Sequence, residues 1–168
     1  MEKFKLSLGK IEKVLLIIAL AFISINLISA FDNDLTDAAL VGLVSNGLVF
    51  VASLILVLKS KDTSITKNDI FVSVILFFAG LLVGQTYSLI NYSSTFTYLA
   101  YEIMYAVPLV MYLLKKEEGT KISFLVVLAY FAVSAIGGSI YSFARFSILL
   151  VFVLCLFKGE EKEWKKHH

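Results

Sequence analysis

Long apolar runs separated by short polar segments set the pattern of this 168-residue chain. A helix needs ~20 largely apolar residues to cross the hydrocarbon core of a bilayer. Six runs approach or exceed that length, and they cover residues 14–31, 38–58, 69–90, 95–114, 122–138 and 140–157. In lipid, a spanning segment must satisfy its own backbone hydrogen bonds, as an α-helix does. We therefore expect an all-α integral membrane protein, a bundle of six transmembrane helices that occupies residues 14–158.

The segments between the runs alternate in charge. Lysines recur in every second segment, namely residues 1–13, 59–67, 115–121 and the tail 159–168, whereas residues 32–37 are acidic. Cytoplasmic segments of membrane proteins are enriched in Lys and Arg. The alternation therefore predicts a multi-pass protein of the cell membrane, with a cytoplasmic N-terminal segment (1–13) and a charged cytoplasmic tail (159–168).

The first run has an alternative interpretation as a cleaved secretory signal. It follows several lysines, and Ala30 offers a small residue at which cleavage could occur. However, the run is longer than the apolar core of a signal peptide, and Asn26 interrupts it. We favour a retained first helix.

The composition supports a membrane protein and excludes several classes of function. Hydrophobic residues make up 59% of the chain, and the net charge of +2 gives no basic surface for nucleic acid. Cys155 is the sole cysteine, which excludes an intrachain disulfide and a cysteine-based metal site. The only histidines, His167 and His168, end the sequence and are either native or the remnant of a purification tag. We expect no metal and no cofactor.

The same inventory argues against an intramembrane enzyme. Glu102 is the only acid inside the apolar runs rather than at their ends, and no histidine is available there as a base. Proteolysis needs an acid dyad, a nucleophile with its base, or a metal. Lipid-transferring chemistry with Glu102 and Arg145 stays open as a minor alternative.

Two of the segments resemble each other. Residues 67–89 align without gaps on residues 121–143, so that Lys67 meets Lys121 and Gly84 meets Gly138. Weak internal repeats of this kind occur in transporters. The match favours three helical hairpins related by a weak repeat, and the alternative is a chance likeness between apolar helices.

The aligned segments also contain small residues four positions apart. These are Gly80 and Gly84 in one segment and Ser134 and Gly138 in the other. Small residues at this spacing let the backbones of membrane helices approach closely. We expect all four to serve helix packing, either within one chain or between copies of it.

Three polar residues are expected at one depth in the bilayer. Asn46, Glu102 and Arg145 each lie thirteen residues before a lysine that ends an apolar run. At 1.5 Å per residue this places them ~20 Å from the cytoplasmic boundary, in the outer half of a core ~30 Å thick. We predict that Glu102 pairs with Arg145, with Asn46 close by.

Further polar side chains point to a binding site around Glu102. Tyr98, Tyr101 and Tyr105 recur at helical spacing on one face beside it, and a charge at this depth costs at least ~2.5 kcal/mol on insertion scales, which marks a functional site. The predicted substrate-binding set is Glu102, Arg145, Asn46, Tyr98, Tyr101, Tyr105, Gln85 and Asn26.

These features predict a solute-binding or transport subunit with an outward-facing polar cavity around the Glu–Arg pair. Its ligand would be a small polar or zwitterionic solute, and its surroundings the lipid bilayer. The alternative is a structural, sensory or assembly subunit, joined to a membrane-protein partner or to copies of itself. In that case the pair only fixes helix packing.

Overall fold

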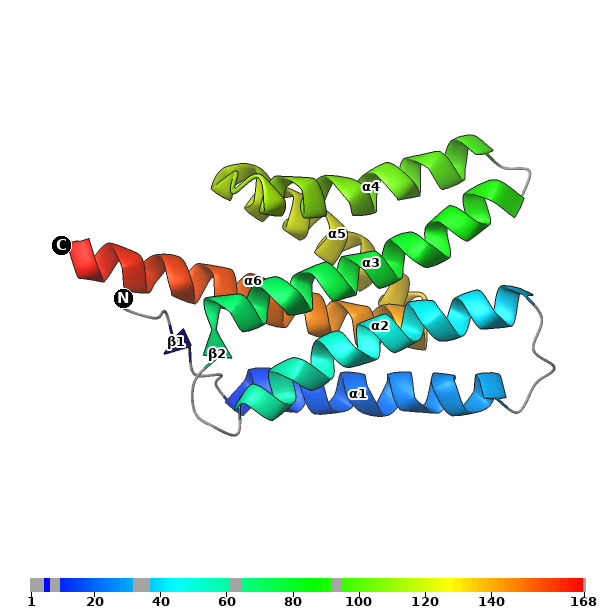
Figure 1. The fold of residues 1–168 in the computed structure, drawn as a ribbon, viewed down its shortest axis with the longest axis horizontal. Helices are drawn as coiled ribbons and strands as arrows, with labels where there is room; N and C mark the ends of the chain where they lie inside the picture. Colours follow the sequence, from blue (N-terminus) through cyan, green and yellow to red (C-terminus); the bar gives the residue numbers. More distant parts are fainter. Residues whose placement is uncertain (1–4, 7–9, 32–36, 61–64, 92–94, 168) are drawn as a thin grey trace.

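The computed structural model of the chain describes residues 5–6, 10–31, 37–60, 65–91 and 95–167. These residues form six helices and one pair of very short strands (Figure 1). The helices are α1 (Lys10–Phe31), α2 (Asp37–Ser60), α3 (Lys67–Asn91), α4 (Thr95–Leu113), α5 (Glu117–Ile136) and α6 (Ile140–His167). The strands, β1 (Lys5–Leu6) and β2 (Ile65–Thr66), pair in antiparallel fashion. The helical prediction is confirmed, with this two-residue ladder as a small correction to the all-α expectation.

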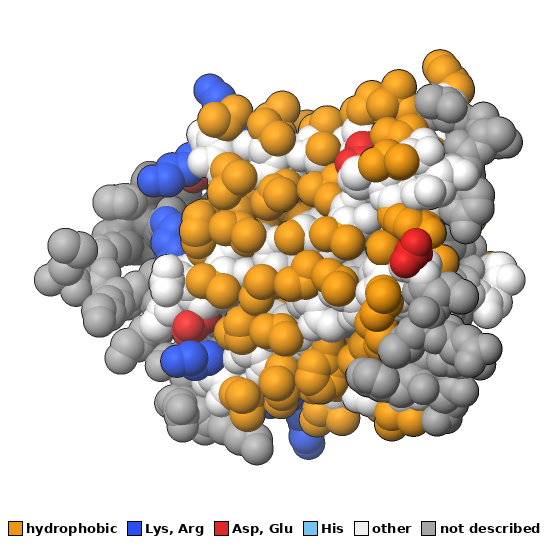
Figure 2. All heavy atoms as spheres, turned by 45° about the vertical axis from the view of Figure 1, so that its right-hand side comes forward, with side chains coloured by type: hydrophobic (Ala, Val, Ile, Leu, Met, Phe, Trp, Pro, Cys, Tyr) orange, Lys and Arg blue, Asp and Glu red, His pale blue; other side chains and the backbone are white. Residues whose placement is uncertain are grey.

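Four of the helices are long and apolar enough to cross a membrane. The spans are Asp37–Lys59, Lys67–Asn91, Phe96–Leu113 and Glu117–Ile136, and α6 contributes a shorter apolar stretch, Ser142–Leu156. Figure 2 shows a broad hydrophobic band across one face, with Lys and Arg side chains along its left side and rim. Large apolar side chains such as Ile136 and Phe96 are 88% and 87% exposed. Because water would penalise such a surface, these features indicate a membrane protein.

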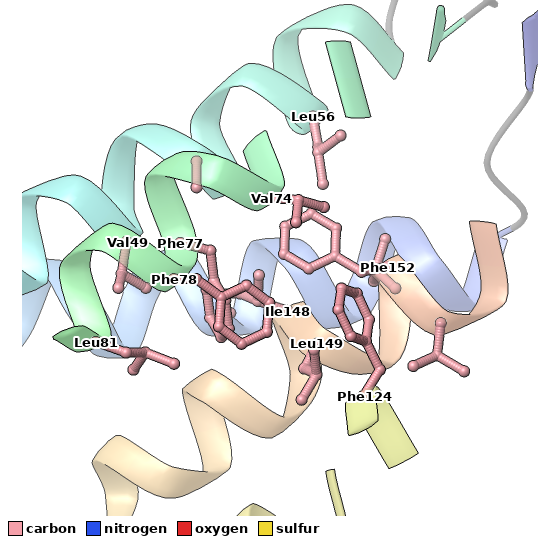
Figure 3. Packing of buried hydrophobic residues seen from close by; sticks show 14 of the residues in the cluster. Val49, Leu56, Val74, Phe77, Phe78, Leu81, Phe124, Ile148, Leu149 and Phe152 are labelled. Carbon is pink, nitrogen blue, oxygen red and sulfur yellow. The ribbon is translucent and has the colours of Figure 1, made fainter. Parts of the chain in front are cut away.

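The helices pack in the order in which they occur along the chain. Each contacts its neighbours in sequence, and α1 also packs against α6, so the packed pairs close into a ring. The centre of the ring is filled by apolar side chains, chiefly from α3 and α6 (Figure 3). Phe77 of α3 meets Phe152 of α6 edge to face, with ring centroids 5.5 Å apart. Aromatic pairs in this geometry are favourable beyond the area that they bury.

The start of α3 is defined by a reciprocal pair of capping bonds. The backbone N–H of Thr66 donates to the Asp69 carboxylate at 3.0 Å, and the N–H of Asp69 donates to Thr66 Oγ1 at 3.2 Å. A capping box of this kind satisfies backbone donors that have no partner within the helix. The local sequence therefore fixes the point at which the β2 strand gives way to a membrane-crossing helix.

The contact between α2 and α3 is unusually close because Gly80 has no side chain. A Cβ at this position would lie 2.6 Å from the carbonyl oxygen of Ser45, and one at Gly84 would lie 3.2 Å from Ser45 Oγ. Two hydrogen bonds join the helices here: Ser45 Oγ donates to the Gly80 carbonyl at 2.6 Å, and Ser73 Oγ to the Ala52 carbonyl at 2.8 Å. Gly80 and Gly84 thus lie where close packing was expected, within a single chain.

Gly138 does not fit the expectation of helix packing. Helix α5 ends at Ile136, and Gly138 lies in the following turn with a φ of 99° and open space where a Cβ would be. This left-handed conformation favours glycine, because any other residue would clash with its own backbone. Ser134 and Gly138 are therefore spaced as they are because Gly138 forms a turn. Gly138 aligns with Gly84 in sequence, but Gly84 is helical and Gly138 is not.

The hydrogen bond from Ser45 gives a first testable expectation. Ser45→Ala should lower the free energy of unfolding by about 0.6 kcal/mol, and by no more than ~1.7 kcal/mol, as measured for polar contacts between membrane helices. Ser24→Ala is the matched control, because Ser24 Oγ donates within its own helix to the Leu20 carbonyl at 2.7 Å. Unfolding in mixed micelles by SDS titration measures both changes, and equal losses would contradict a role for the α2–α3 bond.

Candidate functional site

Glu102 lies half-buried on α4, at the contact with α3. Thr86 Oγ1 of α3 donates to Glu102 Oε1 at 2.6 Å, a length typical of a hydrogen bond to a charged oxygen. The other carboxylate oxygen, Oε2, is buried and has no hydrogen-bond partner within the described part of the chain. Among the residues that the structure describes, it is the only buried side-chain nitrogen or oxygen in this condition. The carboxylate is therefore held by one oxygen and leaves the other as an open acceptor.

A second polar contact joins the same two helices one turn away. Gln85 Nε2 donates to the backbone carbonyl of Tyr98 at 3.3 Å. Gln85 and Thr86 are consecutive on α3, while Tyr98 and Glu102 are four residues apart on α4 and so lie on one face of that helix. The structure thus brings the predicted residues Gln85, Tyr98 and Glu102 together.

The other two predicted tyrosines of α4 face α5. The ring of Tyr101 lies 5.4 Å from that of Tyr130, and the ring of Tyr105 stacks on Phe131 at 6.0 Å. The hydroxyl of Tyr130 is also close to Tyr101 and Ser134. These contacts form a wall of aromatic rings between α4 and α5, which we call the tyrosine cluster: Tyr101, Tyr105 and Tyr130.

Arg145 of α6 belongs to the surroundings of the tyrosine cluster. It is half-buried and lies near enough to Tyr105 and Tyr130 to interact with both electrostatically. Helix α4 packs against α3 and α5, whereas α6 packs against α5 and α1. Within the described part of the chain, the partner of the Glu102 carboxylate is Thr86. The predicted pairing of Glu102 with Arg145 is not seen there. Glu102 and Arg145 lie on α4 and α6, the two helices that pack against α5.

The two predicted asparagines lie elsewhere in the ring. Asn46 is half-buried on α2, whose main packing partners are α1 and α3 rather than α4. Asn26 lies in α1, and its side chain is outside the part of the structure that is described. The common depth expected for Asn46 and Glu102 does not translate into proximity.

Three polar residues with notable positions in the structure were not predicted from the sequence: Thr86, Tyr130 and Glu12. Thr86 gave no signal, because a threonine in an apolar helix most often bonds its own backbone. Tyr130 was visible as a polar residue within an apolar run, but its run contained no charge to draw attention to it. Glu12 is only 6% exposed, because α1 begins at Lys10 and carries this acid into the bundle.

The candidate site combines acidic, aromatic and basic side chains. Within the described residues, no group of three His, Cys, Asp or Glu side chains is placed to hold a metal ion. The site instead offers one open carboxylate oxygen, several aromatic rings and a guanidinium group nearby. Comparison with known proteins finds no family model, no curated protein and no solved structure that matches the chain.

Proposed function

We propose that this chain is a multi-pass protein of the cell membrane that binds or transports a small polar or zwitterionic solute. Its site is the outer half of the bundle, around Glu102, and both ends of the chain face the cytoplasm. The orientation is supported by the lysines, which recur in alternate connections. The site is supported by the buried oxygen of Glu102, which no group in the described segments satisfies.

The unpaired oxygen of Glu102 is energetically costly unless a ligand satisfies it. A buried acceptor without a partner costs ~1–3 kcal/mol, more when it is charged, and native proteins rarely leave one. In a membrane, charged side chains face the interior of the bundle or an aqueous cavity, and they mark pathways for substrates and ions. A solute that donates a hydrogen bond to Oε2 would satisfy the oxygen, and the tyrosine cluster and Arg145 would line the remainder of the site.

Ligand binding can be tested by thermal unfolding of the purified protein against a panel of metabolites, vitamins and lipids. A ligand that binds only the folded state stabilises it, by ~2.7 kcal/mol at a concentration of one hundred times Kd. We expect at least one solute to raise the Tm, and Glu102→Gln to abolish that shift. Glu118→Gln is the matched control, since Glu118 is exposed in the first turn of α5. A Tm shift that survives Glu102→Gln would place the site elsewhere.

One observation favours the second candidate, a structural or assembly subunit. The bond between Thr86 and Glu102 joins α3 to α4 and by itself fixes the register of the two helices. If that were the whole role of the acid, Glu102→Gln would lower the stability of the protein while no solute raised it. The thermal panel therefore separates the two functions.

A further inference from the structure

The open oxygen of Glu102 also limits the chemistry of the solute. Because Thr86 already donates to Oε1, any further donor must approach Oε2, which is an acceptor and carries negative charge when ionised. A donor that also carries positive charge satisfies both the hydrogen bond and the charge. A hydroxyl or an amide would satisfy the hydrogen bond but not the charge.

Two tyrosines that lie about one turn from Glu102 on α4 suit such a cation. Tyr98 precedes Glu102 by four residues and Tyr105 follows it by three, so both residues lie about one helical turn from Glu102. Tyr105 is 5% exposed and stacked on Phe131, which fixes its ring. Aromatic rings within ~6 Å attract ammonium groups, and more strongly where water is excluded.

We infer that the solute carries a protonated amine, whose N–H donates to Oε2 of Glu102 between Tyr98 and Tyr105. Thr86 is a positioning residue: its hydroxyl holds Oε1, so that Oε2 presents a fixed acceptor to the amine. This inference rests on the proposed function and assigns the substrate class to it. The guanidinium of Arg145, near Tyr105 and Tyr130, makes an anionic group at the far end of the solute compatible with the site.

A matched series of small compounds tests the assignment. Two probes, n-butylamine and 4-aminobutyrate, carry a protonated amine. Three others lack a positively charged N–H donor: N,N,N-trimethylbutylammonium, butyrate and 1-butanol. Each is titrated into the full-length protein in lipid nanodiscs, and Kd is measured from the Tm shift. We expect the two amines to bind and Glu102→Gln to weaken them by roughly 10- to 100-fold, the range for a hydrogen bond to a charged group.

The role of Thr86 needs its own pair of variants. Thr86→Val keeps the size of the side chain but removes the hydroxyl. It should weaken amine binding by roughly 5- to 10-fold, less than Glu102→Gln, because Thr86 only orients the carboxylate. Thr86→Ser retains a hydroxyl and should bind amines as the natural protein does. Since Thr86 is exposed, both variants are expected to fold. Equal binding by the valine and serine variants would remove Thr86 from the site.

The outcomes separate this inference from the function on which it rests. If butyrate or 1-butanol binds as tightly as the amines, or trimethylbutylammonium does so, the N–H assignment is wrong while solute binding stands. If a solute without an amine emerges from the metabolite panel and the amines do not bind, the substrate class is again wrong and the function holds. If neither the panel nor the series binds, both proposals fail.

Discussion

Gly80→Ala is expected to destabilise the protein by about 2 kcal/mol or more, although the same change in an open helix is stabilising. The added Cβ would lie 2.6 Å from the Ser45 carbonyl oxygen and 3.0 Å from Val49 Cγ2. The nearer atom is backbone, so relief requires α2 and α3 to move apart and weakens the bond from Ser45 to Gly80. Overpacking of this kind costs typically 1–3 kcal/mol and exceeds the ~1 kcal/mol that alanine adds as a better helix former.

Gly47→Ala provides the control for this change. Gly47 lies in α2, and a Cβ there would meet nothing within 4 Å. Its free energy of unfolding should be unchanged or raised by up to ~1 kcal/mol. SDS titration in mixed micelles measures both variants, and a loss at Gly47 as large as that at Gly80 would show that close helix approach is not the cause.

Phe77→Ala should have an effect of similar size through the opposite defect, a cavity. Phe77 is fully buried, with its ring 5.2 Å from that of Phe78 and 5.5 Å from that of Phe152. In water-soluble proteins Phe→Ala costs 3–5 kcal/mol, part of it from transfer out of water. Between membrane helices that transfer term is largely absent, and lost packing remains. At ~24 cal/mol per Å³ and roughly 100 Å³ of vacated volume, we expect a loss of about 2 kcal/mol.

The same substitution at Phe96 isolates the contribution of packing. Phe96 is 87% exposed near the start of α4, so detergent or lipid covers its ring before and after unfolding. Phe96→Ala should change the unfolding free energy by less than ~0.5 kcal/mol, the usual range for surface sites. Comparable losses at Phe77 and Phe96 would contradict the packed centre of the ring.

The helices could be predicted from the sequence, because hydropathy directly reports which segments lipid tolerates. The four spans found in α2–α5 coincide with predicted runs to within a few residues. The tight α2–α3 contact was also signalled, since Gly80 and Gly84 have few other reasons to recur in a helix. The ends of the helices were harder to predict from the sequence. Helix α1 begins at Lys10, before its apolar run, and Glu12 in its first turn is buried.

The partner of Glu102 could not be predicted, and the reason is geometric. Counting residues from a lysine gives the depth of a side chain in the membrane, but not its position around the ring of helices. Arg145 and Asn46 were matched to Glu102 by depth alone, whereas the packing order places α3 and α5 next to α4. Thr86 lies on one of those neighbours and makes the contact. Which helices adjoin is decided by packing over the entire chain.

The contact between α1 and α6 has a consequence for biosynthesis. Phe22 of α1 meets Phe143 of α6 with ring centroids 5.7 Å apart, and α6 begins only at Ile140. All of α2–α5 must therefore leave the ribosome before the surface that α1 presents to α6 is covered. Helix α1 is thus among the last to complete its contacts, and a nascent chain that stalls before α6 would leave the ring of helices open.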